Sequence, residues 1–149
     1  MSAPIVLEQP ARLALGEQLR ARTAVAAAWL LLALVRARPA RLRRLLRVLH
    51  RGARPAPVEV ALRARAMVAT VSLHAASDHG CLLRSVAIVL ACRFAGVAVT
   101  WRVGVVSPPP ALHAWVEADD KPVGEPFDPR WLYSPIITVE PSRKGILPR

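Results

Sequence analysis

One apolar segment in the middle of the chain sets the strongest constraint on the fold. Residues 81–95 read CLLRSVAIVLACRFA, a composition typical of a helix with apolar side chains on nearly every face. Such a helix is stable in water only when other elements surround it. We therefore expect the chain to fold around a central helix from Cys81 to Ala95, which Gly96 ends.

The elements on the two sides of this helix differ in kind. Helical spacing of apolar residues precedes it, in residues 11–36, 40–51 and 58–76. Strands follow it, predicted at 97–106, at 111–117 and, after a turn at Asp119-Asp120, near Val123. The proline-containing chain from Asp128 onward is predicted to be mostly irregular. Helices followed by an antiparallel sheet indicate an α+β fold.

We expect one compact domain of three parts. They are an extended tail (1–10), a helical N-terminal region (11–76), and a region that holds the central helix and the sheet (77–149). The composition, 54% hydrophobic and 21% charged, excludes an intrinsically disordered chain.

The charge is strongly positive and unevenly distributed. Of the formal net charge of +11, much lies before residue 66, where thirteen arginines face three acidic residues. Such a basic half favours nucleic acid, anionic lipid or an acidic peptide as a partner. Because nearly all the cations are arginine, codon bias in a GC-rich genome is an equally good explanation.

The apolar run Thr23–Val35 raises the question of a membrane. Its thirteen residues fall short of the about twenty that a spanning helix needs. No positively charged start, cleavage site or lipidation motif precedes it. We therefore interpret it as a buried helix, with peripheral contact with a membrane surface as the alternative.

The two cysteines are expected to have different roles. Cys81 and Cys92 lie eleven residues apart on one predicted helix, or about 16 Å at 1.5 Å per residue, too far for a disulfide. Neither has the spacing of a zinc site, and we expect no metal or cofactor. Two unpaired cysteines favour a reducing, cytoplasmic setting. Cys92 has the position of a core residue.

Cys81 instead has the position of a nucleophile. It follows the polar, turn-forming residues 77–80 (SDHG), in which Ser77 and Asp78 are predicted to cap the helix. A helix N-terminus lowers the pKa of a thiol and offers backbone N–H groups to an oxyanion. His113 follows on a predicted strand, and this chain order is typical of papain-like and transglutaminase-like sites.

A third residue is needed to orient the imidazole, and two acids are candidates. Antiparallel pairing across the turn at Asp119-Asp120 brings residues at about 125 to 128 opposite His113, depending on the turn type. Glu125 and Asp128 are both in range, whereas the two residues of the turn lie too far away.

Two segments together carry a resemblance to a known family. CLLRS (Cys81–Ser85) and LHAWVE (Leu112–Glu117), followed by a D-x-x-P-V turn and an acid, resemble the stand-alone lasso-peptide leader peptidases, which are transglutaminase-like cysteine proteases. The interval of 32 residues between the cysteine and the histidine fits, as does the basic helical N-terminus. The resemblance implies a transglutaminase-like or papain-like catalytic core in residues 77–149.

The resemblance also implies roles for residues of the site. Cys81 is expected to be the nucleophile and His113 the general base. The family's third residue, usually an aspartate twelve positions after the histidine, falls on Glu125, with Asp128 as the reserve. Arg84 and Ser85 match family residues; Arg84 either reaches back over the site or extends out of the core. Independently of the resemblance, strand alternation puts Trp115 on the face of His113, where we expect it to pack and position the imidazole, with contact with the substrate as the alternative.

The implied activity is removal of the leader from a ribosomally made lasso-peptide precursor. The implied partners are that precursor, a small protein that recognises the leader, and the lasso cyclase, with no role for nucleic acid. One alternative keeps the triad in a transglutaminase-type acyltransferase or amidase. The other is a non-enzymatic, basic helical binding module for membranes or nucleic acid, in which Cys81 and His113 are structural.

Overall fold

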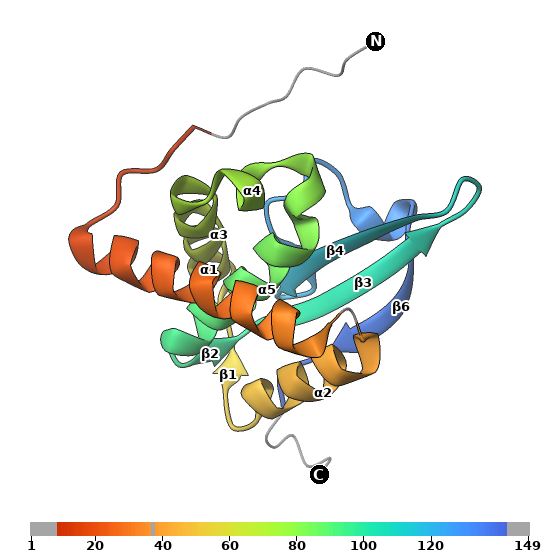
Figure 1. The fold of residues 1–149 in the computed structure, drawn as a ribbon, viewed down its shortest axis with the longest axis horizontal. Helices are drawn as coiled ribbons and strands as arrows, with labels where there is room; N and C mark the ends of the chain where they lie inside the picture. The colour runs from red at the N-terminus through yellow and green to blue at the C-terminus, as the bar shows by residue number, and fades with distance from the viewer. Residues whose placement is uncertain (1–8, 37, 143–149) are drawn as a thin grey trace.

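The structure is a computed structural model that describes residues 9–36 and 38–142 (Figure 1). Residues 1–8 of the predicted extended tail lie outside the described residues, and Gln9 and Pro10 belong to no helix or strand. The predicted α+β class is confirmed. The helices are α1 (Leu15–Val35), α2 (Pro39–His50), α3 (Val58–Val71), α4 (Leu73–Ala76) and α5 (Cys81–Phe94). The strands are β1 (Arg54–Pro55), β2 (Val97–Ala98), β3 (Thr100–Val106), β4 (Ala111–Ala118), β5 (Lys121–Pro122) and β6 (Ser134–Val139).

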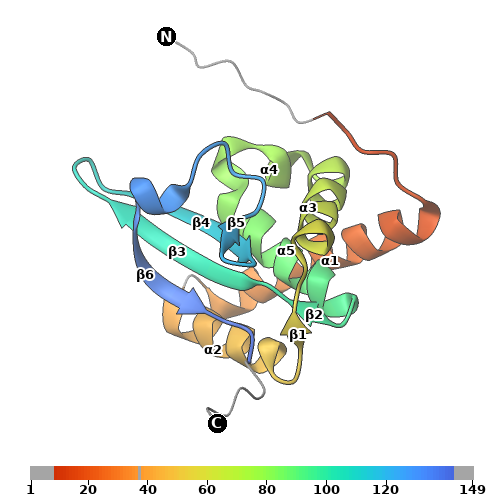
Figure 2. The ribbon, with the colours of Figure 1, turned by 180° about the vertical axis from the view of Figure 1, so that it is seen from behind.

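Helix α5 is the centre of the core, as its composition predicts. Every residue from Leu83 to Cys92 is buried. Helices α1 and α3 pack on it, and strands β3 and β4 contact it from the sheet. Helix α1 crosses in front of the sheet in Figure 1 and passes behind it in the reverse view of Figure 2. The nucleophile predicted at the start of α5 is therefore held by the most enclosed element of the described chain.

The main sheet is antiparallel, with strand order β5-β4-β3-β6. Strands β3 and β4 pair along their whole length, from Thr100 opposite Glu117 to Val106 opposite Ala111. The predicted turn at Asp119-Asp120 is present, and both residues have positive φ (50° and 59°). Two such residues give the two-residue hairpin whose twist matches the strands. A separate parallel pair, β1 with β2, joins the chain after α2 to the chain after α5.

The prediction that the chain from Asp128 onward is mostly irregular is wrong for Ser134–Val139. This segment forms β6 and pairs antiparallel with β3. Proline is tolerated there because β6 is an edge strand, and the register shifts where Gly104 lies opposite Pro135. Residues 143–149 of the predicted irregular tail lie outside the described residues.

The predicted helix 58–76 is interrupted at Ser72. Helix α3 ends at Val71, and Ser72 has extended dihedral angles (φ −137°, ψ 110°). Its hydroxyl accepts a hydrogen bond from the Ala75 backbone N–H (3.2 Å), so it is the N-cap of the short helix α4. Serine competes for backbone hydrogen bonds in this way and favours caps over helix interiors. The break turns the chain toward the start of α5.

The prediction of a wholly buried helix at Thr23–Val35 is correct for one face only. Small residues of α1, including Ala21, Ala24 and Ala28, are buried, whereas Leu30 and Leu34 are 62% and 66% exposed. Among the described residues, α1 is the one helix that length and composition would allow to cross a membrane. In the fold it packs on α3 and α5 through its small side chains. It therefore presents several of its large apolar side chains, including Trp29, outward.

Candidate active site

Cys81 is the first residue of α5, where the chain leaves a short 3-10 turn, η1 (Asp78–Gly80). The residue before the helix is Gly80, so the prediction that Ser77 and Asp78 cap α5 is wrong. The hydroxyl of Ser77 instead donates to the His74 carbonyl at the end of α4 (2.7 Å). A Cβ at position 80 would collide with that same carbonyl, so only glycine allows the close approach. Because glycine has no side chain, Gly80 does not cap the first N–H groups of α5.

The environment of Cys81 favours the thiolate. A hydrogen bond with the His113 side chain is the main cause of a lowered pKa of the thiol, although partial burial raises it. The Ala114 backbone N–H donates to the sulfur and lowers the pKa further. Cys92, on the same helix, is completely buried, and this burial raises its pKa to about 12. Of the two thiols, only Cys81 has the electrostatic surroundings of a nucleophile.

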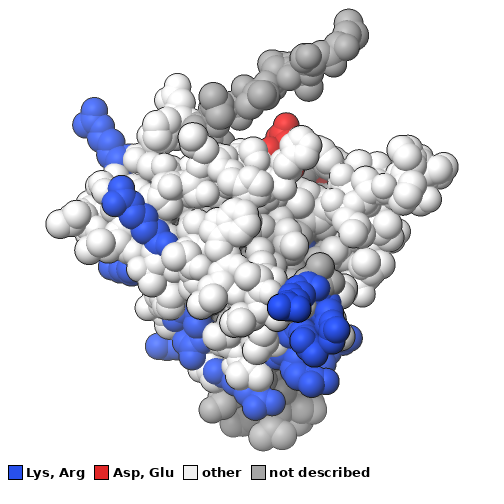
Figure 3. Space-filling view, in the orientation of Figure 1, with Lys and Arg blue, Asp and Glu red and all other residues white. Residues whose placement is uncertain are grey.

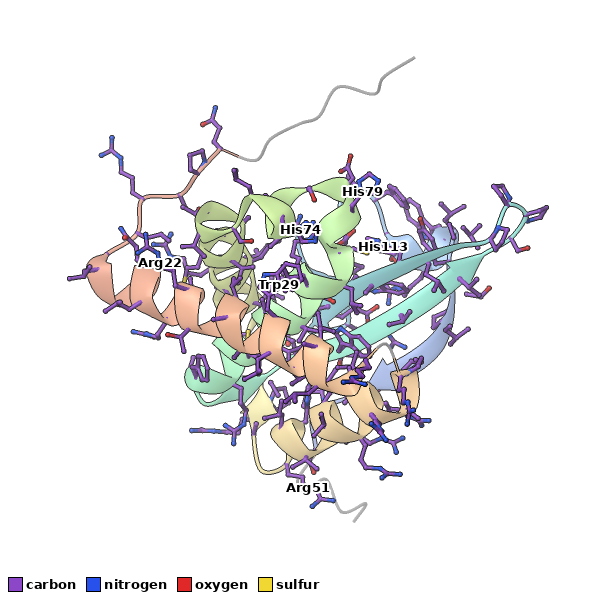
Figure 4. All side chains as sticks on the ribbon, in the orientation of Figure 1. Arg22, Trp29, Arg51, His74, His79 and His113 are labelled. Atoms are coloured by element: carbon purple, nitrogen blue, oxygen red, sulfur yellow. The ribbon has the colours of Figure 1, made fainter. Side chains whose placement is uncertain are left out.

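Glu125 is the acid that lies beside His113. Its Oε2 is 2.9 Å from the Nε2 of His113, so Nδ1 is the ring nitrogen left for Cys81. The hydrogen bond with Cys81 and then that with Glu125 raise the pKa of His113 to about 9. Gly124, with φ +67°, turns the chain after β5 and directs Glu125 back toward the histidine. In Figure 4, His113 lies where the start of α5 meets β4.

Asp128, the second acid in range, has other partners. Its Oδ1 accepts the backbone N–H of Arg130 (3.0 Å), and its Oδ2 lies 2.6 Å from the guanidinium of the same residue. It caps a second 3-10 turn, η2 (Pro129–Trp131). The two acids that sequence spacing left open are therefore separated: the structure brings Glu125, and not Asp128, to His113.

A family model described as Transglutaminase-like superfamily matches residues 11–138, most of the chain. The chain belongs to the transglutaminase-like superfamily. This superfamily generally contains cysteine proteases and acyltransferases. No curated protein and no solved structure matches the chain.

Aromatic rings hold the imidazole of this transglutaminase-like site. Trp115 stacks on His113, with ring centroids 5.9 Å apart and planes inclined by 15°. Tyr133, from the loop before β6, contacts the same ring at 5.2 Å. The indole N–H of Trp115 donates to buried Glu117 (2.9 Å), which lies 3.0 Å from the Arg102 guanidinium. Trp115 thus packs against His113 as predicted. Tyr133 was not predicted, because it lies in the stretch after Asp128 that was expected to be irregular.

Two arginines, Arg65 of α3 and Arg84 of α5, contact the surroundings of the site. The Arg65 guanidinium, from α3, lies 3.9 Å from the Oε1 of Glu125. Arg84 is buried, and its Nη1 donates to the carbonyls of Ala75 (2.9 Å) and Ser77 (3.1 Å). Of the two predicted alternatives for Arg84, extension out of the core is wrong, because the residue is buried; its charge acts on the site and helps to lower the pKa of Cys81. Arg84 fastens the lead-in of Cys81 to its helix, and the apolar pattern of α3 gave no signal for Arg65.

The transglutaminase-like site can form a thiolate–imidazolium pair with an acid behind it. Nucleophilic acyl chemistry needs a thiolate, a proton donor for the leaving group and oxyanion donors. Cys81, His113 and the uncapped first turn of α5 are suited to these three tasks. Among the described residues, no group of three or more His, Cys, Asp or Glu side chains could hold a metal ion.

The raised pKa of His113 leads to a prediction about pH. In acyl chemistry an imidazolium can protonate the leaving group, and the His113 imidazolium is retained below about pH 9 and lost above it. We expect kcat/KM for peptide cleavage to fall as pH rises through that value. Because Glu125 helps to raise this pKa, Glu125→Gln should move the alkaline limb to lower pH. The measurement is a pH–rate profile of both proteins, and an unmoved limb in the variant would contradict the assignment.

Proposed function

We propose that this chain is a cysteine endopeptidase that removes the leader from a ribosomally made lasso-peptide precursor. The observation that carries the proposal is the contact of Cys81, at the first turn of α5, with His113, which Glu125 holds at 2.9 Å. Membership of the transglutaminase-like superfamily supports a cysteine nucleophile. The finer assignment to leader removal rests on the CLLRS and LHAWVE segments.

In the proposed reaction, the Cys81 thiolate attacks the scissile carbonyl carbon and forms a C–S bond. Backbone N–H groups at the start of α5 stabilise the oxyanion. The imidazolium of His113 gives its proton to the amine as the C–N bond breaks, which leaves a thioester. Neutral His113 then takes a proton from water, whose oxygen attacks the thioester carbon. The C–S bond breaks and the thiolate returns.

The decisive experiment is incubation of the full chain with a lasso precursor peptide, followed by mass spectrometry of the products. Cleavage at one bond between leader and core, with addition of one water, is the expected result. A product joined to an added primary amine in place of water would favour an acyltransferase, which uses the same thioester. A precursor that stays intact, with the recognition protein present, would contradict the proposal.

We also propose that α2 helps to dock a small protein that recognises the leader. Its Leu42, Leu46 and His50 are buried against the body of the protein. Its opposite face is exposed and basic, and Figure 3 shows arginines gathered over this part of the molecule. The exposed arginines of this face include Arg41, Arg43, Arg44 and Arg47. A surface of this charge favours an acidic partner.

Reversal of this charge gives a second prediction. Replacing Arg43, Arg44 and Arg47 with Glu should weaken assembly with the recognition protein at least about tenfold, because like charges across an interface repel. Cleavage by the variant should slow, whereas alkylation of Cys81 by iodoacetamide should not. Co-sedimentation with anionic vesicles serves as the control. If the triple variant loses vesicle binding but keeps the assembly, α2 contacts a membrane surface instead.

A further inference from the structure

An apolar hollow is lined in part by the residues next in sequence to Cys81 and His113. It is bordered by the end of α1, the start of α2, the first turn of α5 and the strands β3, β4 and β6. Its volume is about 240 Å³, and among the described residues that line it only Arg38 is charged. The apolar side chains that line it include Leu32, Leu42, Leu82, Val103, Leu112 and Ile137.

Two lining residues are the immediate chain neighbours of the reactive pair. Leu82 follows Cys81 in the first turn of α5, and Leu112 precedes His113 on β4. Because alternate residues of a strand point to opposite faces, Leu112 points away from the face that His113 occupies. Consecutive Cα atoms are only about 3.8 Å apart. Leu112 lies on the same face of β4 as Ala114, whose backbone N–H donates to the Cys81 sulfur. A peptide whose carbonyl reaches that sulfur can therefore place a neighbouring side chain toward Leu82 and Leu112.

The size and exposure of the hollow suit one large side chain. A cavity of about 150 Å³ is enough to hold a benzene molecule. The rim residues Leu82 and Leu112 are 40% and 65% exposed, so an apolar group that enters removes their surface from water. An apolar concavity next to convergent polar groups is the usual form of a ligand site.

We propose that this hollow is a specificity pocket that receives a large aliphatic or aromatic side chain of the substrate peptide. The side chain belongs to a residue within about two positions of the carbonyl that acylates Cys81, since an extended chain rises about 3.3 Å per residue. The inference rests on the proposed acyl chemistry at Cys81. It adds that this chemistry selects peptides by an apolar residue close to the cleaved bond.

The test uses chloroacetamides, from which a thiolate displaces chloride to form a thioether. N-methyl chloroacetamide reports the reactivity of the sulfur alone, and N-hexyl chloroacetamide adds an aliphatic chain that can enter the hollow. The rates of Cys81 modification on the full chain are followed by peptide mass spectrometry. We expect the hexyl probe to modify Cys81 at least about tenfold faster than the methyl probe, because even one methylene in an apolar pocket discriminates about tenfold.

Variants at the rim sharpen the test. Leu82→Gln and Leu112→Thr should remove the advantage of the hexyl probe and leave the methyl rate within about twofold of the parent, because both side chains are exposed and neither bears the reactive atom. Leu73→Gln is the matched control, since Leu73 is 84% exposed and does not line the hollow. It should keep the advantage.

Different outcomes would contradict the pocket and the nucleophile. If both probes modify Cys81 of the parent protein at equal rates, and faster than they modify glutathione, the pocket is wrong and the nucleophile stands. An advantage that persists in both rim variants also overturns the pocket. If neither probe modifies Cys81 faster than glutathione, the proposed acyl chemistry fails, and the pocket falls with it.

Discussion

Cys81→Ala is expected to abolish peptide cleavage and to leave the fold intact. The thiolate is the nucleophile of the first step of the proposed reaction and the leaving group of the second, and removal of a nucleophile costs at least about a thousandfold in rate. The side chain is half-buried at a helix N-terminus, so alanine leaves only a small space there. The measurement is single-turnover cleavage of a precursor peptide, with circular dichroism and thermal unfolding as the check on the fold.

Cys92→Ala is the matched control on the same helix. Cys92 is completely buried, and its thiol has a pKa raised to about 12 by that burial. The variant should keep full chemistry and lose about 1 to 2 kcal/mol of stability, as a small core truncation does. Iodoacetamide near neutral pH should modify Cys81 first in the parent protein. Full cleavage by the Cys81→Ala protein would end the protease hypothesis.

The parts of the fold that were predictable are those in which one local pattern dominates. The helix from Cys81 is apolar on nearly all faces, and that pattern allows only the centre of the core. The hairpin of β4 and β5 follows from alternation and from two residues, Asp119 and Asp120, that tolerate positive φ. Local chemistry was sufficient there because no distant partner was needed to decide the outcome.

Helix α1 shows why burial could not be predicted. Most of its fully buried residues are alanines, including Ala24 and Ala28, whereas some larger side chains, such as Leu30 and Leu34, point outward. Hydropathy has no clear direction around such a helix, so the pattern does not identify the buried face. Small residues allow α1 to pack closely on α3 and α5. Whether such close packing is needed depends on those two helices and not on α1 itself. Sequence composition alone does not reveal it.

Two residues of the candidate site, Cys81 and His113, were proposed from sequence and lie in contact, whereas the orienting acid was left open. Chain order and a helix start are enough to single out Cys81 and His113, whereas hairpin geometry admitted every residue from 125 to 128. The choice depends on Gly124, whose positive φ ends the regular pairing of β5. It also depends on Arg130, which engages Asp128. Both are tertiary details that spacing does not contain.

Glu125→Gln is expected to lower the single-turnover rate of cleavage by about ten- to a thousandfold, with little change in substrate binding. The carboxylate lies 2.9 Å from His113, where it orients the ring and stabilises the imidazolium. In a serine protease the equivalent change costs about four orders of magnitude. We expect a smaller loss here because the thiolate itself also holds the imidazolium, and is the first cause of the raised pKa of His113.

Asp128→Asn is the matched control for Glu125→Gln, since it also converts an acid to its amide. Its carboxylate is engaged by Arg130, and it has no described contact with His113. The change should therefore leave the cleavage rate within about twofold of the parent, because asparagine can also cap η2. Both variants are compared on one precursor peptide after thermal unfolding shows that each is folded. If Asp128→Asn is the impaired protein and Glu125→Gln is not, the orienting acid is Asp128, and the loop from β5 to η2 must rearrange when substrate binds.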